Sequence, residues 1–153
     1  MTEISDIAPD FTLPRDGGGE IRLSDLRPAP VVLFFYPRDD TSGCTKEATA
    51  FTALADEFAA AGVKVIGISK DSVASHDKFV IKHDLGIPLV SDEAGDTAER
   101  YGTWKEKKMY GKTFMGIERT TFLIDGDGRI AQVWRKVKVP GHAEEVLEAA
   151  RAL

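Results

Sequence analysis

Residues 31–44, VVLFFYPRDDTSGC, hold the features that decide the fold. Residues 31–36 are β-branched, leucine or aromatic without a break, which predicts a strand buried on both faces. After Cys44, apolar residues recur at helical spacing: Ala48, Phe51, Leu54, Ala55 and Phe58. The only cysteine of the chain is therefore predicted to lie in the first turn of a helix that follows a central strand.

A thiol in that position is expected to be reactive. The first turn of a helix carries unpaired N–H groups and the positive end of the helix dipole, and both favour an anion. Cys44 should therefore ionise more easily than an ordinary cysteine. The alternative interpretation is that Cys44 is a small, buried, inert apolar residue.

The bulk composition describes an ordinary globule. The chain has 153 residues, of which 42% are hydrophobic and 29% charged, and its net charge is −5. This balance argues against nucleic acid or an anionic membrane as a partner. The acidic N-terminus does not resemble a signal peptide, and one cysteine cannot form an intramolecular disulfide. A cytoplasmic location is expected.

The remaining elements alternate between strand and helix in the first part of the chain. A strand at residues 9–13, a glycine turn at 16–19 and a return strand through Ile21 and Leu23 predict an N-terminal hairpin. The helix after Cys44 should end at Gly62, before a buried strand at residues 63–68. A second helix, capped within residues 69–72, should end near Gly86 and lead to an extended segment at 87–90.

The second half is predicted to close the sheet. A short helix is expected at residues 94–101 and a long ordered loop at 104–115. Residues 120–124 and 130–134 should form a hairpin. A last helix should bury five apolar side chains: Ala143, Val146, Leu147, Ala150 and Leu153. This order predicts one α/β domain over residues 1–153, with a mixed central sheet flanked by helices in a thioredoxin-like plan.

The residue types available to Cys44 exclude several reactions of a cysteine thiolate. The three histidines, His76, His83 and His142, are predicted to lie on helix surfaces, so neither a histidine base nor a metal site is expected. No second cysteine is present for disulfide exchange. Peroxide reduction needs only a thiolate, hydrogen-bond donors and a cation.

Candidates for each of these parts are present. Thr41 offers a hydroxyl, Gly43 and Cys44 offer N–H groups, and Pro37 can shield the sulfur. Arg119, just before a buried strand, is the best candidate cation. Arg38 and Lys46 lie closer in sequence, but they are interpreted as solvated surface charges.

A resemblance to a known family now becomes specific. The pattern Pro37-x-x-x-Thr41-x-x-Cys44 resembles the active-site signature of peroxiredoxins, and FFYPRDDTSGCTKEA is similar to the PrxQ branch, also called bacterioferritin comigratory protein. The similarity extends over almost the whole chain, through VIGISKDS, PLVSD, YGTWKEK and GKTFMGIERTTFLID.

The resemblance implies a peroxiredoxin fold, a thiol-dependent peroxidase and no cofactor or metal. It makes Cys44 the peroxidatic cysteine, which becomes a sulfenic acid, with Thr41 and Arg119 positioning the peroxide and Pro37 guarding the pocket. Trp104 and Met115 would line the wall of the site, although packing in a core or loop is an alternative role for both.

The sequence departs from this branch at the resolving cysteine. Many members carry it five residues after the first cysteine, where this chain has Thr49, and others on the next helix, where it has Val80. A one-cysteine cycle is therefore predicted, with thioredoxin, glutaredoxin with glutathione, or a small thiol as external reductant. Because the branch is often monomeric, a monomer is expected, with a Cys44-linked dimer on oxidation as the alternative.

Three functions are weighed. The leading hypothesis is a peroxidase acting on hydrogen peroxide and organic hydroperoxides. A redox sensor or relay that passes oxidation to a partner by mixed disulfide is the second, and a structural domain with an unreactive thiol is the third.

Overall fold

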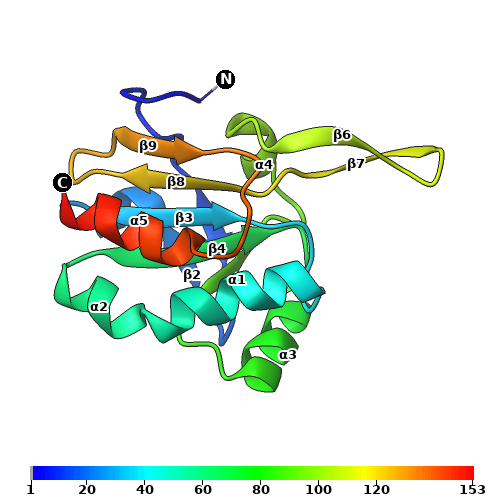
Figure 1. The fold of residues 1–153 in the computed structure, drawn as a ribbon, viewed down its shortest axis with the longest axis horizontal. Helices are drawn as coiled ribbons and strands as arrows, with labels where there is room; N and C mark the ends of the chain where they lie inside the picture. Colours follow the sequence, from blue (N-terminus) through cyan, green and yellow to red (C-terminus); the bar gives the residue numbers. More distant parts are fainter. Residues whose placement is uncertain (1) are drawn as a thin grey trace.

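A five-stranded mixed sheet forms the centre of the molecule in a computed structural model that describes residues 2–153 (Figure 1). Its strand order is β5-β4-β3-β8-β9, and β3 pairs in parallel with β4 and antiparallel with β8. The strands are β3 (Val31–Phe35), β4 (Lys64–Ser69), β5 (Leu89–Ser91), β8 (Thr120–Ile124) and β9 (Ile130–Trp134). The strand before Cys44 is thus the central one, as the sequence predicted.

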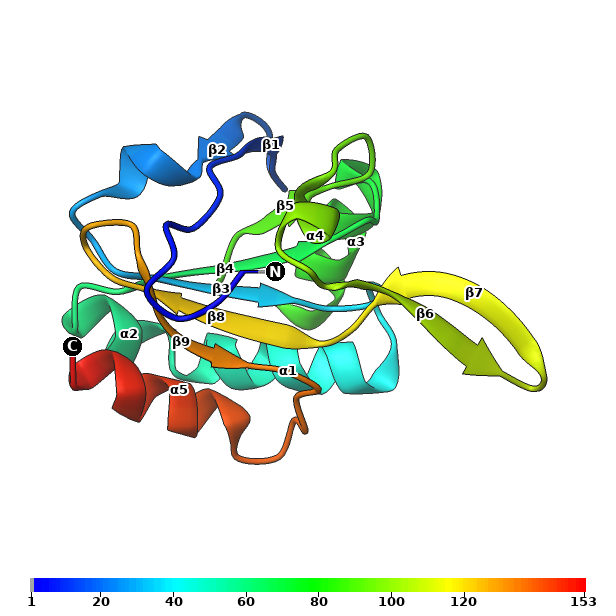
Figure 2. The same ribbon diagram turned by 90° about the horizontal axis from the view of Figure 1, so that it is seen from above.

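Helices and the N-terminal hairpin cover the two faces of this sheet. Figure 2 shows α1, α2 and α5 on one side, and the β1–β2 hairpin with α4 on the other. The bounds are β1 (Thr12–Pro14), β2 (Glu20–Arg22), a 3-10 turn (Leu23–Leu26), α1 (Ser42–Ala53), α2 (Ala55–Ala60), α3 (Val73–His83), α4 (Thr97–Arg100) and α5 (His142–Arg151). The thioredoxin-like plan with an N-terminal hairpin is confirmed.

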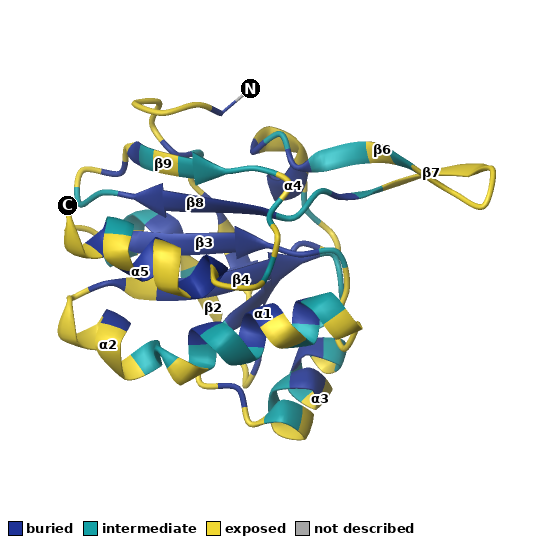
Figure 3. Ribbon diagram, viewed as in Figure 1, coloured by how far each residue is buried: buried dark blue, intermediate teal, exposed yellow. Residues whose placement is uncertain are grey.

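The core is divided by the sheet into two apolar clusters. Because neighbouring side chains of a strand point to opposite faces, Val32 and Phe34 join one cluster and Leu33 and Phe35 the other. All five residues of β3 and of β8 are buried, so these strands are dark along their length in Figure 3. The uninterrupted apolar run therefore marks a strand covered on both faces, as expected.

Two helix predictions need correction. The single helix expected up to Gly62 is broken at Leu54, whose φ of −101° and ψ of 6° leave the helical region. The break separates α1 from α2 while keeping Phe51 and Phe58 together in the core, with ring centroids 5.9 Å apart. Leu153, expected to be buried, is 55% exposed because α5 ends at Arg151, before a further apolar turn can form.

The prediction of a loop at residues 104–115 is wrong. This segment is most of a hairpin made of β6 (Trp104–Met109) and β7 (Lys112–Ile117), which projects from the body of the molecule (Figure 1). Tyr110 and Gly111 form the turn with φ of 52° and 75°, the conformation of a tight hairpin turn. Because most of the hairpin packs on no core, its strands lack the apolar alternation that would have indicated them.

Within residues 2–153, no helix has both the length and the apolar character needed to cross a membrane.

The stacked aromatic pair beneath α1 should carry a large share of the stability. Phe51 is fully buried and stacks on Phe34 at 4.7 Å between ring centroids. We expect Phe51→Ala to lower the free energy of unfolding by about 3–5 kcal/mol, through lost burial and the cavity left behind. A urea titration measures this. Phe114→Ala, on the exposed hairpin, serves as control and should stay within about 0.5 kcal/mol. Equal effects of the two changes would contradict this account of the core.

Candidate active site

Cys44 is the third residue of α1, directly after the loop that leaves β3. The first helical hydrogen bond of this turn runs from the Thr45 N–H to the Thr41 carbonyl, at 2.8 Å. The N–H groups of residues 42–44 therefore precede the first bond of the helix and are available to an incoming ligand. The thiol itself is almost buried, with 1% of the residue exposed.

Arg119 is the cation that meets this sulfur. Its Nη2 donates a hydrogen bond to Cys44 Sγ at 3.3 Å, from a residue 75 positions later in the chain. Arg119 lies in the short link between β7 and β8. The antiparallel pairing places Thr120 opposite Phe35, so the start of β8 and the end of β3 share one edge of the sheet. The structure thus brings Arg119, the candidate from the sequence, next to the sulfur, and its role toward a peroxide or the thiolate stays a prediction.

The other side of the guanidinium is held by Glu47. Arg119 Nη1 donates to Glu47 Oε1 at 2.7 Å, and Glu47 is buried on the same face of α1 as Cys44. Burial raises the pKa of Glu47 to about 7, against the lowering effect of the Arg119 charge. Burial alone would lower the pKa of Arg119. The nearby Glu47 and Cys44 raise this pKa by more than burial lowers it, so the net shift is upward. Arg119 is therefore a permanent cation that bridges a carboxyl group and the sulfur.

Gly43 gives the guanidinium room to reach the sulfur. A Cβ atom at this position would lie 3.0 Å from Arg119 Nη2, closer than side chains normally approach. A larger residue would require the end of the Arg119 side chain to shift by a few tenths of an ångström. The absence of a side chain at Gly43 is thus a steric feature of the site, and the predicted role of its N–H group toward a peroxide stays a prediction.

Thr41 and Pro37 lie in the loop that leads into α1. Thr41 is the N-cap residue, but its hydroxyl does not cap the helix; it donates to the Arg38 carbonyl at 3.0 Å. Its lone pairs remain free to accept a hydrogen bond. Pro37 is half-buried between β3 and this loop. Their predicted roles toward a peroxide stay predictions.

The hairpin residues predicted to line the wall have other surroundings. Trp104 packs against the core on the opposite face of the sheet from Cys44, and Lys70 Nζ lies 5.2 Å from the centroid of its ring. Met115 is half-exposed on β7, opposite Glu106 of β6. The described contacts favour the packing role for Trp104, and a role of either residue in peroxide binding remains a prediction.

The prediction that the histidines lie on helix surfaces is wrong for two of them. His76 and His142 are buried, and only His83 is partly exposed. His142 Nε2 lies 2.8 Å from the Thr121 hydroxyl, and burial together with the Arg119 charge lowers its pKa to about 4. Among the hydrogen bonds of the described residues, none joins an imidazole to Cys44. A polar residue on an apolar helix stripe can thus be a satisfied buried group, which spacing alone does not indicate.

Glu47 is the residue of this site that the sequence analysis missed. It lies three residues after Cys44, on the stripe that also buries Ala48 and Phe51. Residues three and four apart share a helix face, so a carboxylate at this position must face the core. A buried carboxylate requires a cation or donor, and this requirement was the available signal.

Solved structures with a similar fold define the class of protein. The bacterioferritin comigratory protein of Xanthomonas campestris has a TM-score of 0.90 and 44% identity, covering 99% of this chain and 96% of that one. The peroxidoxin BcpB of Mycobacterium tuberculosis has a TM-score of 0.88 and 39% identity, covering 100% and 99%. The fold is therefore the thioredoxin-like fold of peroxiredoxins.

Sequence comparison gives the family. A family model described as AhpC/TSA matches residues 4–133. Peroxiredoxin Bcp of Bacillus subtilis is 46% identical over 149 residues, which cover 97% of this chain and 95% of that protein. The chain belongs to the AhpC/TSA family and, within it, to the Bcp or PrxQ peroxiredoxins, which are thiol-dependent peroxidases.

The buried Glu47 should leave a mark on the pH dependence of stability. Its pKa is 4.5 in an unfolded chain and about 7 in the fold, so between these values the folded protein holds more protons. Stability therefore falls as pH rises from about 4.5 through 7. Glu47→Gln removes this loss, which amounts to at most about 3 kcal/mol.

Urea titrations of the wild type and of Glu47→Gln at several pH values measure the effect. We expect the variant to gain stability relative to the wild type as pH rises across this window. A difference that does not depend on pH would show that Glu47 ionises in the fold as it does in the unfolded chain.

Proposed function

We propose that this protein reduces hydrogen peroxide and organic hydroperoxides to water and alcohols, with Cys44 as the peroxidatic cysteine. The observation that carries the proposal is the 3.3 Å contact between Arg119 Nη2 and Cys44 Sγ at the start of α1. A guanidinium at this distance stabilises a thiolate over a thiol, and the thiolate is the nucleophile. The alkyl peroxide reduction activity stated for the Xanthomonas campestris relative supports organic hydroperoxides as substrates.

The proposed oxidation is a displacement at oxygen. The Cys44 sulfur attacks one peroxide oxygen, a sulfur–oxygen bond forms and the O–O bond breaks. The sulfur loses two electrons and becomes a sulfenic acid, while the other oxygen takes a proton and leaves as water or alcohol. Negative charge that leaves the sulfur develops on the departing oxygen, so donors fixed around both atoms lower the barrier.

The neighbours of Cys44 supply such donors and acceptors. Arg119 and the N–H groups of Gly43 and Cys44 offer hydrogen bonds to peroxide oxygens. Because the Thr41 hydroxyl proton is donated to the Arg38 carbonyl, its oxygen is left to accept the peroxide O–H. Pro37 adds a half-buried ring without a donor beside the loop, which limits the access of water.

We propose that an external thiol completes the cycle. The chain has one cysteine, and the two family positions for a resolving cysteine hold other residues. The Thr49 hydroxyl donates to the Thr45 carbonyl within α1, and Val80 packs against the core from α3. One thiol condenses with the sulfenic acid, releasing water and forming a mixed disulfide, and a second thiol releases Cys44. Thioredoxin, glutaredoxin with glutathione, or a small thiol fits this scheme.

The lack of a resolving cysteine also favours a second candidate function. A sulfenic acid without an internal partner persists until an outside thiol arrives, which is what a relay to a partner protein requires. We propose a monomer that acts in a reducing, cytoplasmic setting, because a chain with one free thiol and no possible intramolecular disulfide is typical of that compartment.

Removal of the sulfur or of its cation should separate chemistry from fold. We expect Cys44→Ser to abolish peroxide turnover, and Arg119→Met to lower kcat/KM by about 100-fold or more, in line with the loss of a positioned donor. The control is Arg38→Met, which changes an exposed side chain on the loop that leads into α1 and should keep wild-type turnover. Circular dichroism checks that the variants are folded. Residual turnover in Cys44→Ser would contradict the assignment of the nucleophile.

Two measurements, steady turnover with each reductant and trapping of a mixed disulfide, identify what reduces the oxidised Cys44. Given one equivalent of hydrogen peroxide, Cys44 should gain one oxygen by mass spectrometry and then yield a mixed disulfide with the added thiol. Steady turnover with thioredoxin, glutaredoxin with glutathione, or a small thiol identifies a peroxidase cycle. A mixed disulfide that forms once and persists with every reductant would instead favour the relay. A Cys44-linked dimer as the main product would contradict recycling by an external thiol.

A further inference from the structure

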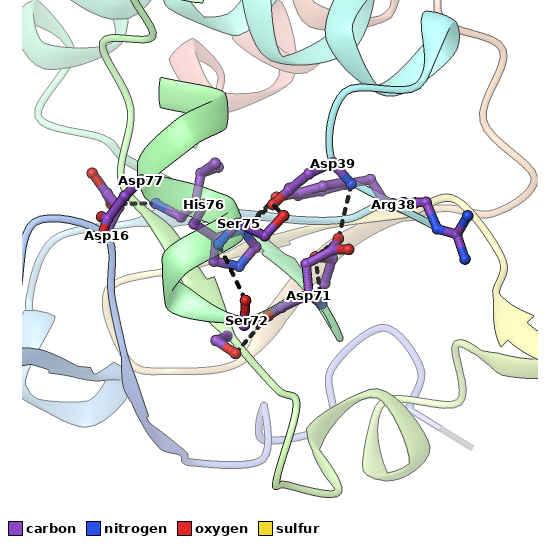
Figure 4. Close-up of polar contacts among 12 residues, drawn as sticks. Asp16, Arg38, Asp39, Asp71, Ser72, Ser75, His76 and Asp77 are labelled. Carbon is purple, nitrogen blue, oxygen red and sulfur yellow. Dashed lines mark hydrogen bonds and ion pairs between the residues drawn. The ribbon is translucent and has the colours of Figure 1, made fainter. Parts of the chain in front are cut away.

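A buried ion pair anchors the loop before Cys44 to α3. His76 has no exposed surface, and its Nδ1 lies 2.7 Å from Asp39 Oδ2, while its Nε2 lies 3.0 Å from the Val90 carbonyl oxygen. Carboxylate and carbonyl oxygens only accept hydrogen bonds, so both ring nitrogens must donate. With Asp39 ionised, the geometry is that of an imidazolium ion at His76 with Asp39 as its counter-ion. Figure 4 shows the two side chains facing each other between the loop and the helix.

Asp39 is held by further contacts on every side. The Tyr36 hydroxyl donates to Oδ1 at 2.7 Å and the Ser75 hydroxyl to Oδ2 at 2.8 Å. Its backbone N–H donates to Asp71 Oδ2 at 2.8 Å. The carboxylate and the backbone of this one loop residue are thus tied to Tyr36 just after β3, to α3 and to the segment between β4 and α3. The Arg38 side chain, in contrast, points away from this cluster (Figure 4).

The anchored residue lies next to the reaction site. Asp39 follows Arg38, whose carbonyl accepts the Thr41 hydroxyl, and Thr41 is the N-cap residue of α1. Fixing Asp39 therefore fixes the carbonyl that orients Thr41. Arg119 holds Cys44 from the side of β8, and the Asp39–His76 pair holds the loop from the side of α3.

The energetics indicate that this pair serves position more than stability. Taking both charges out of water is expensive, and an apolar pair of similar volume is often as stable or more so. The backbone hydrogen bonds of a helix or strand would hold Asp39 without such an anchor. Asp39, however, lies in the loop between β3 and α1. A fully satisfied polar network can instead hold one loop conformation.

We propose that His76 and Asp39 are positioning residues for the peroxide step, which hold Thr41 in register with the Cys44 sulfur. The proposal rests on the peroxidase function proposed above. It assigns to α3 a part in catalysis although none of its residues contacts the sulfur among the described hydrogen bonds. A displacement of about 1 Å at a reacting group can lower a rate about 100-fold.

The chain offers a matched control for the test. His83 lies on the same helix and its Nε2 is 2.7 Å from Asp40 Oδ1, in the same loop. This second pair is at the surface, where ion pairs contribute little. We expect His76→Gln to lower the second-order rate of Cys44 with hydrogen peroxide about tenfold or more, and His83→Gln to leave it unchanged.

Alkylation of Cys44 by iodoacetamide separates position from general damage. This reaction needs a thiolate and access but not the peroxide contacts of Thr41, so His76→Gln should change it little. A selective loss toward peroxide supports the proposal. Equal losses toward both reagents, or no loss toward peroxide, would overturn it. A wild-type protein that alkylates rapidly but shows no reaction with peroxide would instead refute the proposed function.

Two further measurements cover a variant that fails to fold. Ser75→Ala removes one donor to Asp39 but keeps the ion pair, so it should show a smaller loss that is again selective for peroxide. The groups that face the His76 ring are Asp39, Asp71 and Tyr36. Nitrogen-detected NMR of the wild type at neutral pH should find both ring nitrogens of His76 protonated. A neutral His76 ring would overturn the ion pair and the proposal with it.

Discussion

The contact between the Arg119 guanidinium and the Cys44 sulfur is the interaction on which the rest of this structure depends. An almost buried thiol is ordinarily a poor nucleophile, because burial in apolar surroundings disfavours the thiolate. The Arg119 guanidinium, a permanent cation, lies 3.3 Å from this sulfur and donates a hydrogen bond to it, and the proposed mechanism depends on this contact. The cation must itself be held in place, and Glu47 does so at 2.7 Å from the same face of α1. Sulfur, guanidinium and carboxyl group therefore form one unit that spans two distant parts of the chain.

The sheet topology explains why these parts meet. β3 and β8 are antiparallel neighbours, so the end of one and the start of the other lie at the same edge. The chain leaves β3 into α1 and enters β8 from the hairpin at that edge. Both strands are buried along their whole length, which leaves them little freedom to shift in register. The large apolar core thus sets the distance between two polar side chains that lie at its margin.

Much of this could be predicted from the sequence because the informative signals are local and apolar. The run of residues 31–36 has the composition of a buried central strand, and the stripe through Ala48 and Phe51 has helical spacing. The prediction failed for the hairpin that begins at Trp104, because most of its two strands stand away from the core and show no alternation of apolar and polar residues. Leu54 interrupts the helix although no proline or glycine marks the break.

Sequence spacing reached Arg119 but could not reach its partners. Arg119 stands before a recognisable strand, so its location at a sheet edge could be inferred. Glu47 needed the further step of asking what a carboxylate does on a buried stripe. His76 and Asp39 are 37 residues apart, in a helix and a loop, and only the tertiary structure brings them together. Polar pairs of this kind are specified by the packing of the tertiary structure, which the periodicity of the sequence does not reveal.

The buried polar groups at this edge place opposing demands on the molecule. A peroxide is a small ligand, so its reaction benefits from a sulfur and donors that are already fixed, since little has to be reorganised when it arrives. An external thiol must approach the oxidised sulfur in line, and a residue that is 1% exposed does not allow this without movement of its neighbours. In the proposed cycle, the anchors that favour oxidation therefore oppose reduction. A chain with a second cysteine could relieve this conflict internally, whereas in the proposed cycle this chain has to rely on its external thiol partner. The strength of the two anchors, on Cys44 and on Asp39, then sets the balance between the two half-reactions.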